Sequence, residues 1–133
     1  MIMERQQQAI VSFQAGYNCC QAIVLAYRAE LKIDERTAFE LGASYGGGHY
    51  QGLCGALAGC YIVTNQLKGT PKTNDPAECV GAATEKIIDR LNQDFQQACG
   101  SLYCKEIIGK RPCSEYVGEA CRILEKQLAV GNK

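Results

Sequence analysis

Apolar residues recur every three or four positions along most of this 133-residue chain, which is the spacing of helices that bury one face. The strict alternation of apolar and polar residues that is typical of half-buried strands does not occur. The pattern therefore predicts an all-α fold, a compact bundle of six to seven helices. The length predicts a single helical domain over residues 1–133.

Capping residues and glycines mark where the expected helices begin and end. Asn18 and Gln21 are spaced as a capping box, and Asp34 is a second capping residue. Asp75, followed by Pro76, is another clear start signal. The expected helices span residues about 3–14, 18–31, 35–45, 53–69, 76–100, 101–109 and from 113 or 114 onward.

Three of these segments carry a stripe of residues at helical spacing that we expect to build the core. The stripes consist of Leu53, Leu57, Cys60, Tyr61 and Thr64, of Val80, Thr84, Ile87, Leu91 and Phe95, and of Val117, Cys121, Leu124 and Leu128. Ile10 and Phe13 add an inner side to the first helix.

Charge and hydropathy exclude several kinds of partner. Fourteen basic residues balance fourteen acidic ones, so no strong field draws the chain to nucleic acid or to an anionic membrane. No apolar run reaches the roughly 18 residues that a membrane span needs. The first residues, MIMERQQQAIV, lack the basic-then-apolar order of a secretory signal, so we expect a cytoplasmic protein.

Nine cysteines are more than a cytoplasmic chain of this size needs. Their odd number and the adequate core argue against a disulfide framework, which leaves metal binding, redox chemistry or simple burial. No C-x-x-C pattern occurs, so a thioredoxin-like site, a zinc ribbon and ferredoxin spacing are not indicated. Any site must gather cysteines that are distant in the sequence.

Four cysteines lie near expected helix starts, namely Cys19, Cys54, Cys104 and Cys113. Free backbone N–H groups at a helix start stabilise a thiolate, and we expect them to lower the thiol pKa at these positions. The cations Lys105, Lys110 and Arg111 stand near the last two cysteines and favour the same shift. A thiolate is both a nucleophile and a metal ligand, so this placement suits either role.

The other five cysteines are assigned to structure. Cys60 and Cys121 lie on apolar stripes, where they pack as small hydrophobic residues. Cys79 and Cys99 stand at the two ends of the expected fifth helix. Cys20 follows Cys19 directly and therefore points in another direction, because adjacent helical residues face about 100° apart.

The segment GGGHYQGLCGALAGC, residues 46–60, is rich in glycine. Gly52, Gly55 and Gly59 share one helix face, which admits either a neighbouring helix or a cofactor held over the first-turn N–H groups. No nucleotide P-loop pattern is present. His49, the only histidine, is either an ordinary loop residue or the group that transfers a proton to and from the thiols.

These cysteine segments resemble those of the C_GCAxxG_C_C family of small bacterial and archaeal proteins. CGALAG at 54–59 fits its C-G-A-x-x-G motif, and GYNCCQAIVLAY, GSLYCKEIIG and RPCSEYVGEAC resemble its other three segments, over residues about 13–121. The resemblance implies a redox-active protein whose four shared cysteines are Cys19, Cys54, Cys104 and Cys113. The resemblance also implies that the gene for this protein lies near genes for membrane transporters. Leu53, Cys20 and Cys121 depart from the family pattern.

Three functions follow as hypotheses. The first is a thiol redox or electron-transfer protein, with Cys54 as the central thiolate and the other three helix-start cysteines as disulfide partners or ligands. The second is a module that binds zinc or an iron–sulfur cluster through the same four cysteines, with His49 able to replace one. The third is an accessory protein for a redox partner or a membrane transporter, or a bundle whose cysteines only pack. A small-residue face also allows a homodimer.

Overall fold

The computed structural model describes residues 4–43, 45, 46, 51–68 and 84–131. Within them it contains α1 (Arg5–Gln14), α2 (Cys19–Ala26), α3 (Arg28–Leu31), α4 (Glu35–Gly42), α5 (Gly55–Lys68), α7 (Glu85–Cys99), α8 (Cys104–Ile107) and α9 (Cys113–Gly131). The all-α prediction is confirmed, since the described residues otherwise form only two isolated β-bridges. The predicted count of six to seven helices is wrong, because the described residues alone form eight.

The extra helix arises from a break at Tyr27 inside the segment that was expected to be one helix over residues 18–31. Tyr27 has φ −107° and ψ 9°, which separates α2 from α3. Its N–H bonds to the carbonyl of Val24 instead of continuing the helical pattern, and Lys32 then ends α3 with a left-handed φ of 60°. No glycine or proline marks this break, so the sequence pattern had no signal for it.

The local start and stop signals are confirmed elsewhere. Both hydrogen bonds of the Asn18–Gln21 capping box are present, and the Asp34 carboxylate accepts from the N–H of Thr37 at 2.8 Å. Gly100, with φ +95°, ends α7 as expected. The start signal at residues 75–76 lies outside the described residues.

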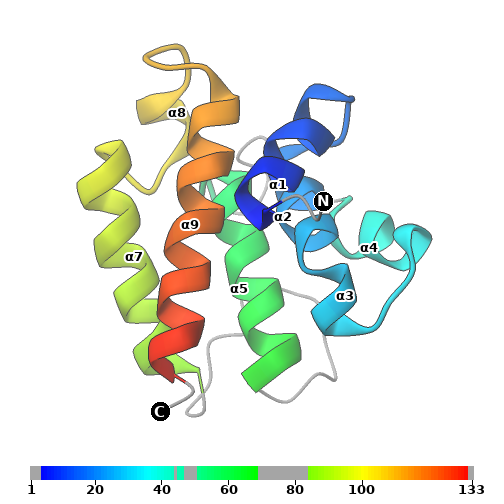
Figure 1. Ribbon diagram of the computed structural model, residues 1–133. Helices are drawn as coiled ribbons and strands as arrows, with labels where there is room; N and C mark the ends of the chain where they lie inside the picture. The colour runs from blue at the N-terminus through cyan, green and yellow to red at the C-terminus, as the bar shows by residue number, and fades with distance from the viewer. Residues whose placement is uncertain (1–3, 44, 47–50, 69–83, 132–133) are drawn as a thin grey trace.

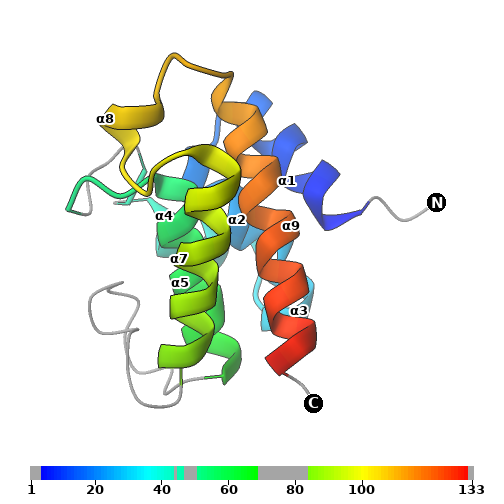
Figure 2. The ribbon, with the colours of Figure 1, turned by 90° about the vertical axis from the view of Figure 1, so that its left-hand side faces the viewer.

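Figure 1 shows α5, α7 and α9 as long helices that lie side by side, and Figure 2 shows the same group from the side of α7. Helix α2 packs against α1, α4, α5 and α9, and it is therefore the central helix of the other half. The short α8 lies beyond one end of the bundle, ahead of the start of α9 (Figure 1). The site described below forms at this end.

The core contains the expected stripes wherever they fall in the described residues. Leu57, Thr64, Leu91, Phe95, Val117 and Leu124 are all fully or almost fully buried. Burial of these side chains is the main contribution to stability in a bundle of this kind. No helix in the described part of the chain combines the length and the apolar character that crossing a membrane requires.

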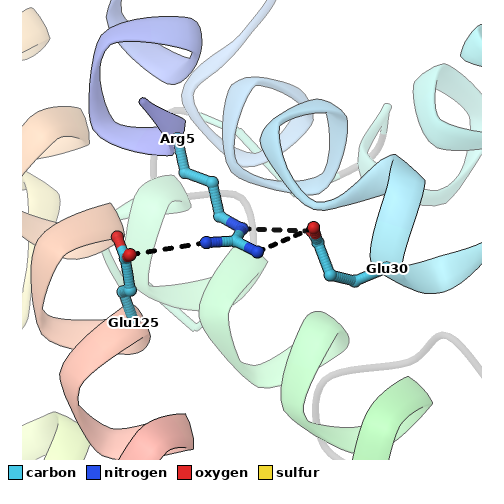
Figure 3. A network of polar contacts seen from close by, with 3 residues as sticks. All are labelled: Arg5, Glu30 and Glu125. Atoms are coloured by element: carbon cyan, nitrogen blue, oxygen red, sulfur yellow. Dashed lines mark hydrogen bonds and ion pairs between the residues drawn. The ribbon is translucent and has the colours of Figure 1, made fainter. Parts of the chain in front are cut away.

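Arg5 connects the first helix to two later ones (Figure 3). Its guanidinium pairs with Glu30 of α3 at 2.7 Å and with Glu125 of α9 at 3.4 Å. The same group lies over the ring of Tyr27, 5.1 Å from its centroid. These contacts hold α1 against the helix break at Tyr27.

Candidate functional site

All four cysteines at the predicted helix starts line one cavity of about 260 Å³. Cys19, Cys104 and Cys113 are the first residues of α2, α8 and α9, and Cys54 directly precedes α5. The structure thus brings together thiols from segments that are up to 94 positions apart in the sequence, from residue 19 to residue 113. The sequence left open whether the four cysteines converge, and in this structure all four line the same cavity.

A short backbone pairing holds Cys54 and Cys104 in register. Leu53 and Tyr103 form an isolated antiparallel bridge, in which the N–H of Cys54 donates to the carbonyl of Leu102 at 2.8 Å. The N–H of Cys104 donates to the carbonyl of Gly52, also at 2.8 Å. Because side chains alternate across extended backbone, Cys54 and Cys104 leave this bridge on the same side.

Cys19 affects the acidity of the other three cavity thiols. Its charge would raise the pKa of Cys54, the pKa of Cys104 and the pKa of Cys113, in each case after burial as the largest cause. Its Sγ also lies against the Cα of Gly55, where an added methyl group would overlap it. Gly55 therefore lets Cys19 approach the start of α5, beside Cys54.

The expected lowering of the thiol pKa is wrong for Cys54. Its Sγ accepts hydrogen bonds from the N–H groups of Ala56 and Leu57, which do favour the thiolate. However, only 6% of Cys54 is exposed, and burial outweighs these bonds and raises its pKa to about 12. Helix-start geometry is present, yet the thiol stays protonated at neutral pH.

The expected lowering of the thiol pKa is also wrong for Cys104 and Cys113. Burial raises the pKa of both thiols, and neighbouring thiols raise it further. The Arg111 guanidinium, which was expected to help them, instead donates to the carbonyl of Ala98 at 3.0 Å and lies over the Tyr116 ring. The Arg111 charge lowers the pKa of Cys99, but burial outweighs this effect and raises that pKa to about 11.

The glycines of this region serve backbone shape and helix packing. Gly52 has φ +80°, a left-handed conformation that most residues avoid, and it precedes the bridge. Gly59 lies under α2, since an added Cβ would stand 2.8 Å from Cβ of Ile23 and 3.0 Å from the carbonyl of Cys20. The neighbouring helix thus occupies this face at Gly59, and the cofactor alternative has no room there. Of Gly52, Gly55 and Gly59, only Gly55 lines the cavity.

The cysteines assigned to packing are buried away from the cavity. Cys20, Cys60 and Cys121 are each at most 1% exposed, and Cys60 Sγ donates to the carbonyl of Ala120 at 3.5 Å. Cys20 belongs to the core while Cys19 lines the cavity, as their adjacent positions predicted. Cys79 and His49, to which a structural and a proton-transfer role were assigned, lie outside the described residues.

The apolar part of the cavity wall could not be recognised from the sequence. Besides the cysteines, Asn18 and Gly55, the wall is built by Phe13, Ile107, Ile108, Tyr116 and Val117. The helical pattern had placed Phe13 and Val117 on inner faces, but nothing in it distinguished a cavity from a filled core.

The described residues give the metal alternative no geometric support. Among them, no group of three or more His, Cys, Asp or Glu side chains is arranged to hold a metal ion. The four cavity thiols therefore share a space without forming a preassembled ligand set.

The fold and the cavity define an all-helical protein with a clustered thiol site. Residues 17–127 match the family model described as "Putative redox-active protein (C_GCAxxG_C_C)", and the chain belongs to this family. The family description supports a general redox role. Neither the comparison with curated proteins nor that with solved structures found a match.

The raised pKa of Cys54 predicts how its alkylation depends on pH. Only the thiolate reacts, so the rate with iodoacetamide is expected to rise about tenfold per pH unit from pH 8 to 10 without levelling off. Peptide mass spectrometry of the anaerobic, reduced protein measures the rate at Cys54 alone. The unfolded chain in denaturant is the control, where the same thiol should level off near its ordinary pKa of about 8.5. A plateau below pH 9 in the folded protein would contradict the assigned shift.

Proposed function

We propose that this protein is a dithiol redox protein, in which two of the four cavity thiols reversibly form a disulfide. The observation that supports this most strongly is the single cavity lined by Cys19, Cys54, Cys104 and Cys113. Four thiols without a preassembled metal geometry suit disulfide chemistry better than a zinc or iron–sulfur site. The redox role of the family supports the same reaction class.

The reaction is thiol–disulfide exchange. One cavity thiol loses its proton, attacks a sulfur of an external disulfide, and forms a mixed disulfide while the first external thiolate leaves. A second cavity thiolate then attacks the protein sulfur of the mixed disulfide, and the second external thiolate leaves. The protein dithiol is oxidised to a disulfide, the external disulfide is reduced to two thiols, and the two protons pass to the departing thiolates.

Burial sets Cys54 apart from the other three thiols in this scheme. Cys19, Cys104 and Cys113 are all half-buried, whereas Cys54 is buried and poorly suited to the first attack on the external disulfide, which we assign to Cys104 or Cys113. Cys19 interacts with each of the other three and acts as the resolving thiol. This reverses the roles expected from the sequence, where Cys54 was central. His49 keeps its proposed role as proton acceptor.

The decisive experiment follows which thiols are oxidised. Protein purified and reduced without oxygen is treated with a small acyclic disulfide such as bis(2-hydroxyethyl) disulfide, then alkylated and mapped by mass spectrometry. The expected product is two hydrogens lighter than the reduced chain, with one disulfide that joins two of the four cavity cysteines. Reductant should restore the original mass.

A matched control separates the cavity from the core. Cys60→Ala removes a buried thiol that does not line the cavity, and it should form the same disulfide at the same rate. If the unsubstituted protein keeps all its thiols free, or joins Cys60 to Cys121 instead, the proposal is disproved.

We also propose that the protein acts in the cytoplasm, where the reducing environment would regenerate the dithiol.

A further inference from the structure

The cavity offers an incoming molecule almost nothing but apolar surface. Its wall consists of the thiols and of aromatic and aliphatic side chains, chiefly Phe13, Ile107, Tyr116 and Val117. None of the described residues that line it carries a charged side chain. Its volume of about 260 Å³ equals that of about nine water molecules in the liquid, which suits a small molecule.

The two other polar side chains of the wall already have their hydrogen-bond partners. The Asn18 amide donates to the carbonyls of Gly42 and Ala43, both at 3.2 Å, and its oxygen accepts from the N–H of Gln21. The hydroxyl of Tyr116 donates to the carbonyl of Ile107 at 2.8 Å. Neither group is arranged to solvate a charge on a molecule inside the cavity.

Burial raises the pKa of Cys54, of Cys104 and of Cys113, so these three thiols carry no charge at pH 7. One aliphatic side chain of the wall also reaches the surface, since Ile108 lines the cavity and is 57% exposed.

We propose that the cavity selects an uncharged, apolar disulfide of low molecular weight as the exchange partner of its thiols. The proposal rests on the proposed dithiol function and adds the class of substrate. The exchange is the one written above: an uncharged disulfide R–S–S–R enters, two R–SH leave, and the protein dithiol becomes a disulfide. Charged disulfides are rejected, because no described residue of the wall replaces the water that their charges lose.

The test compares three disulfides of similar size with different charge. Diethyl disulfide is uncharged, dithiodiglycolate carries two negative charges, and cystamine carries two positive charges at pH 7. For each probe, the rate of disulfide formation in the folded protein is divided by its rate with the thiols of the unfolded chain. This ratio removes the intrinsic reactivity of the probe.

We expect the normalised rate to be at least about 100-fold higher for diethyl disulfide than for either charged probe. Equal normalised rates, or a faster charged probe, would overturn the substrate class while leaving the dithiol function intact. No intramolecular disulfide with any of the probes would instead overturn the proposed function, and the substrate class with it.

A charge beside the cavity should change the selectivity in a defined direction. Ile108→Lys places a cation beside the cavity at an exposed position, and it should raise the rate with dithiodiglycolate about five- to tenfold relative to diethyl disulfide. Val11→Lys is the matched control, because Val11 is 42% exposed and does not line the cavity. An equal shift in both variants would mean that the probes react elsewhere, and it would overturn the proposal.

Discussion

Replacing Cys19 with serine is expected to slow formation of the cavity disulfide at least about 100-fold, because the attack that resolves the mixed disulfide loses its intramolecular nucleophile. Cys19 lines the same cavity as Cys54, Cys104 and Cys113, and its charge would raise the pKa of each. A serine hydroxyl fills nearly the same space but does not attack a disulfide. The first attack remains intact, so the mixed disulfide should accumulate at Cys104 or Cys113.

Mass spectrometry distinguishes this trapped species from an unreactive protein, since the mixed disulfide adds the mass of one half of the probe. Cys20→Ala is the matched control, because it removes the adjacent thiol of the same helix, which belongs to the core and not to the cavity wall. The control should form the disulfide at an unchanged rate. Rapid disulfide formation in the Cys19→Ser protein would contradict the resolving role.

Gly59→Ala is expected to destabilise the protein by about 1–3 kcal/mol, the usual cost of forcing an extra carbon into a packed core. The new Cβ would stand 2.8 Å from Cβ of Ile23 and 3.0 Å from the carbonyl of Cys20. A backbone carbonyl and a β-branched side chain cannot move aside independently of α2. The melting temperature should fall by about 3–10 °C, as measured by circular dichroism.

Gly118→Ala is the matched control for this substitution. Gly118 is a buried glycine of α9, and an added Cβ would stand closest to the terminal Cδ1 of Ile10, at 2.9 Å. The far end of a flexible side chain can rotate away, so the stability should change by less than about 1 kcal/mol. Equal destabilisation by the two variants would show that the contact with α2 is not the cause.

The helix-start positions of Cys19, Cys54 and Cys113 were predictable because each depends on local signals, whereas α8 begins at Cys104, three residues after the expected start at residue 101. Asn18 and Gln21 set the start of α2 and hence the place of Cys19, and their capping box is observed. Helix starts expected near residues 53 and 113 agree with the observed starts of α5 and α9 to within two residues. The family resemblance implied the same four cysteines, and all four line the cavity.

The acidity of those thiols was not predictable from the same signals. A helix start can be recognised from four or five neighbouring residues, whereas burial depends on what distant segments place over the sulfur. Cys54 receives its two N–H bonds from Ala56 and Leu57, as its position implied. Its low exposure comes from the whole packed end of the bundle, and burial decides the direction of its pKa shift.

The cavity is complete only when nearly the whole chain has been made, because its thiols come from residues 19 to 113. Before the residues of α9 have left the ribosome, the thiols of the nascent chain are exposed and have an ordinary pKa. They then react readily with oxidants in solution. Completion of the fold buries the same sulfurs, and this burial raises the pKa of Cys54 and of Cys113. Synthesis is therefore the stage at which these cysteines are most exposed to random oxidation, and completion of the fold restricts their chemistry to what the cavity admits.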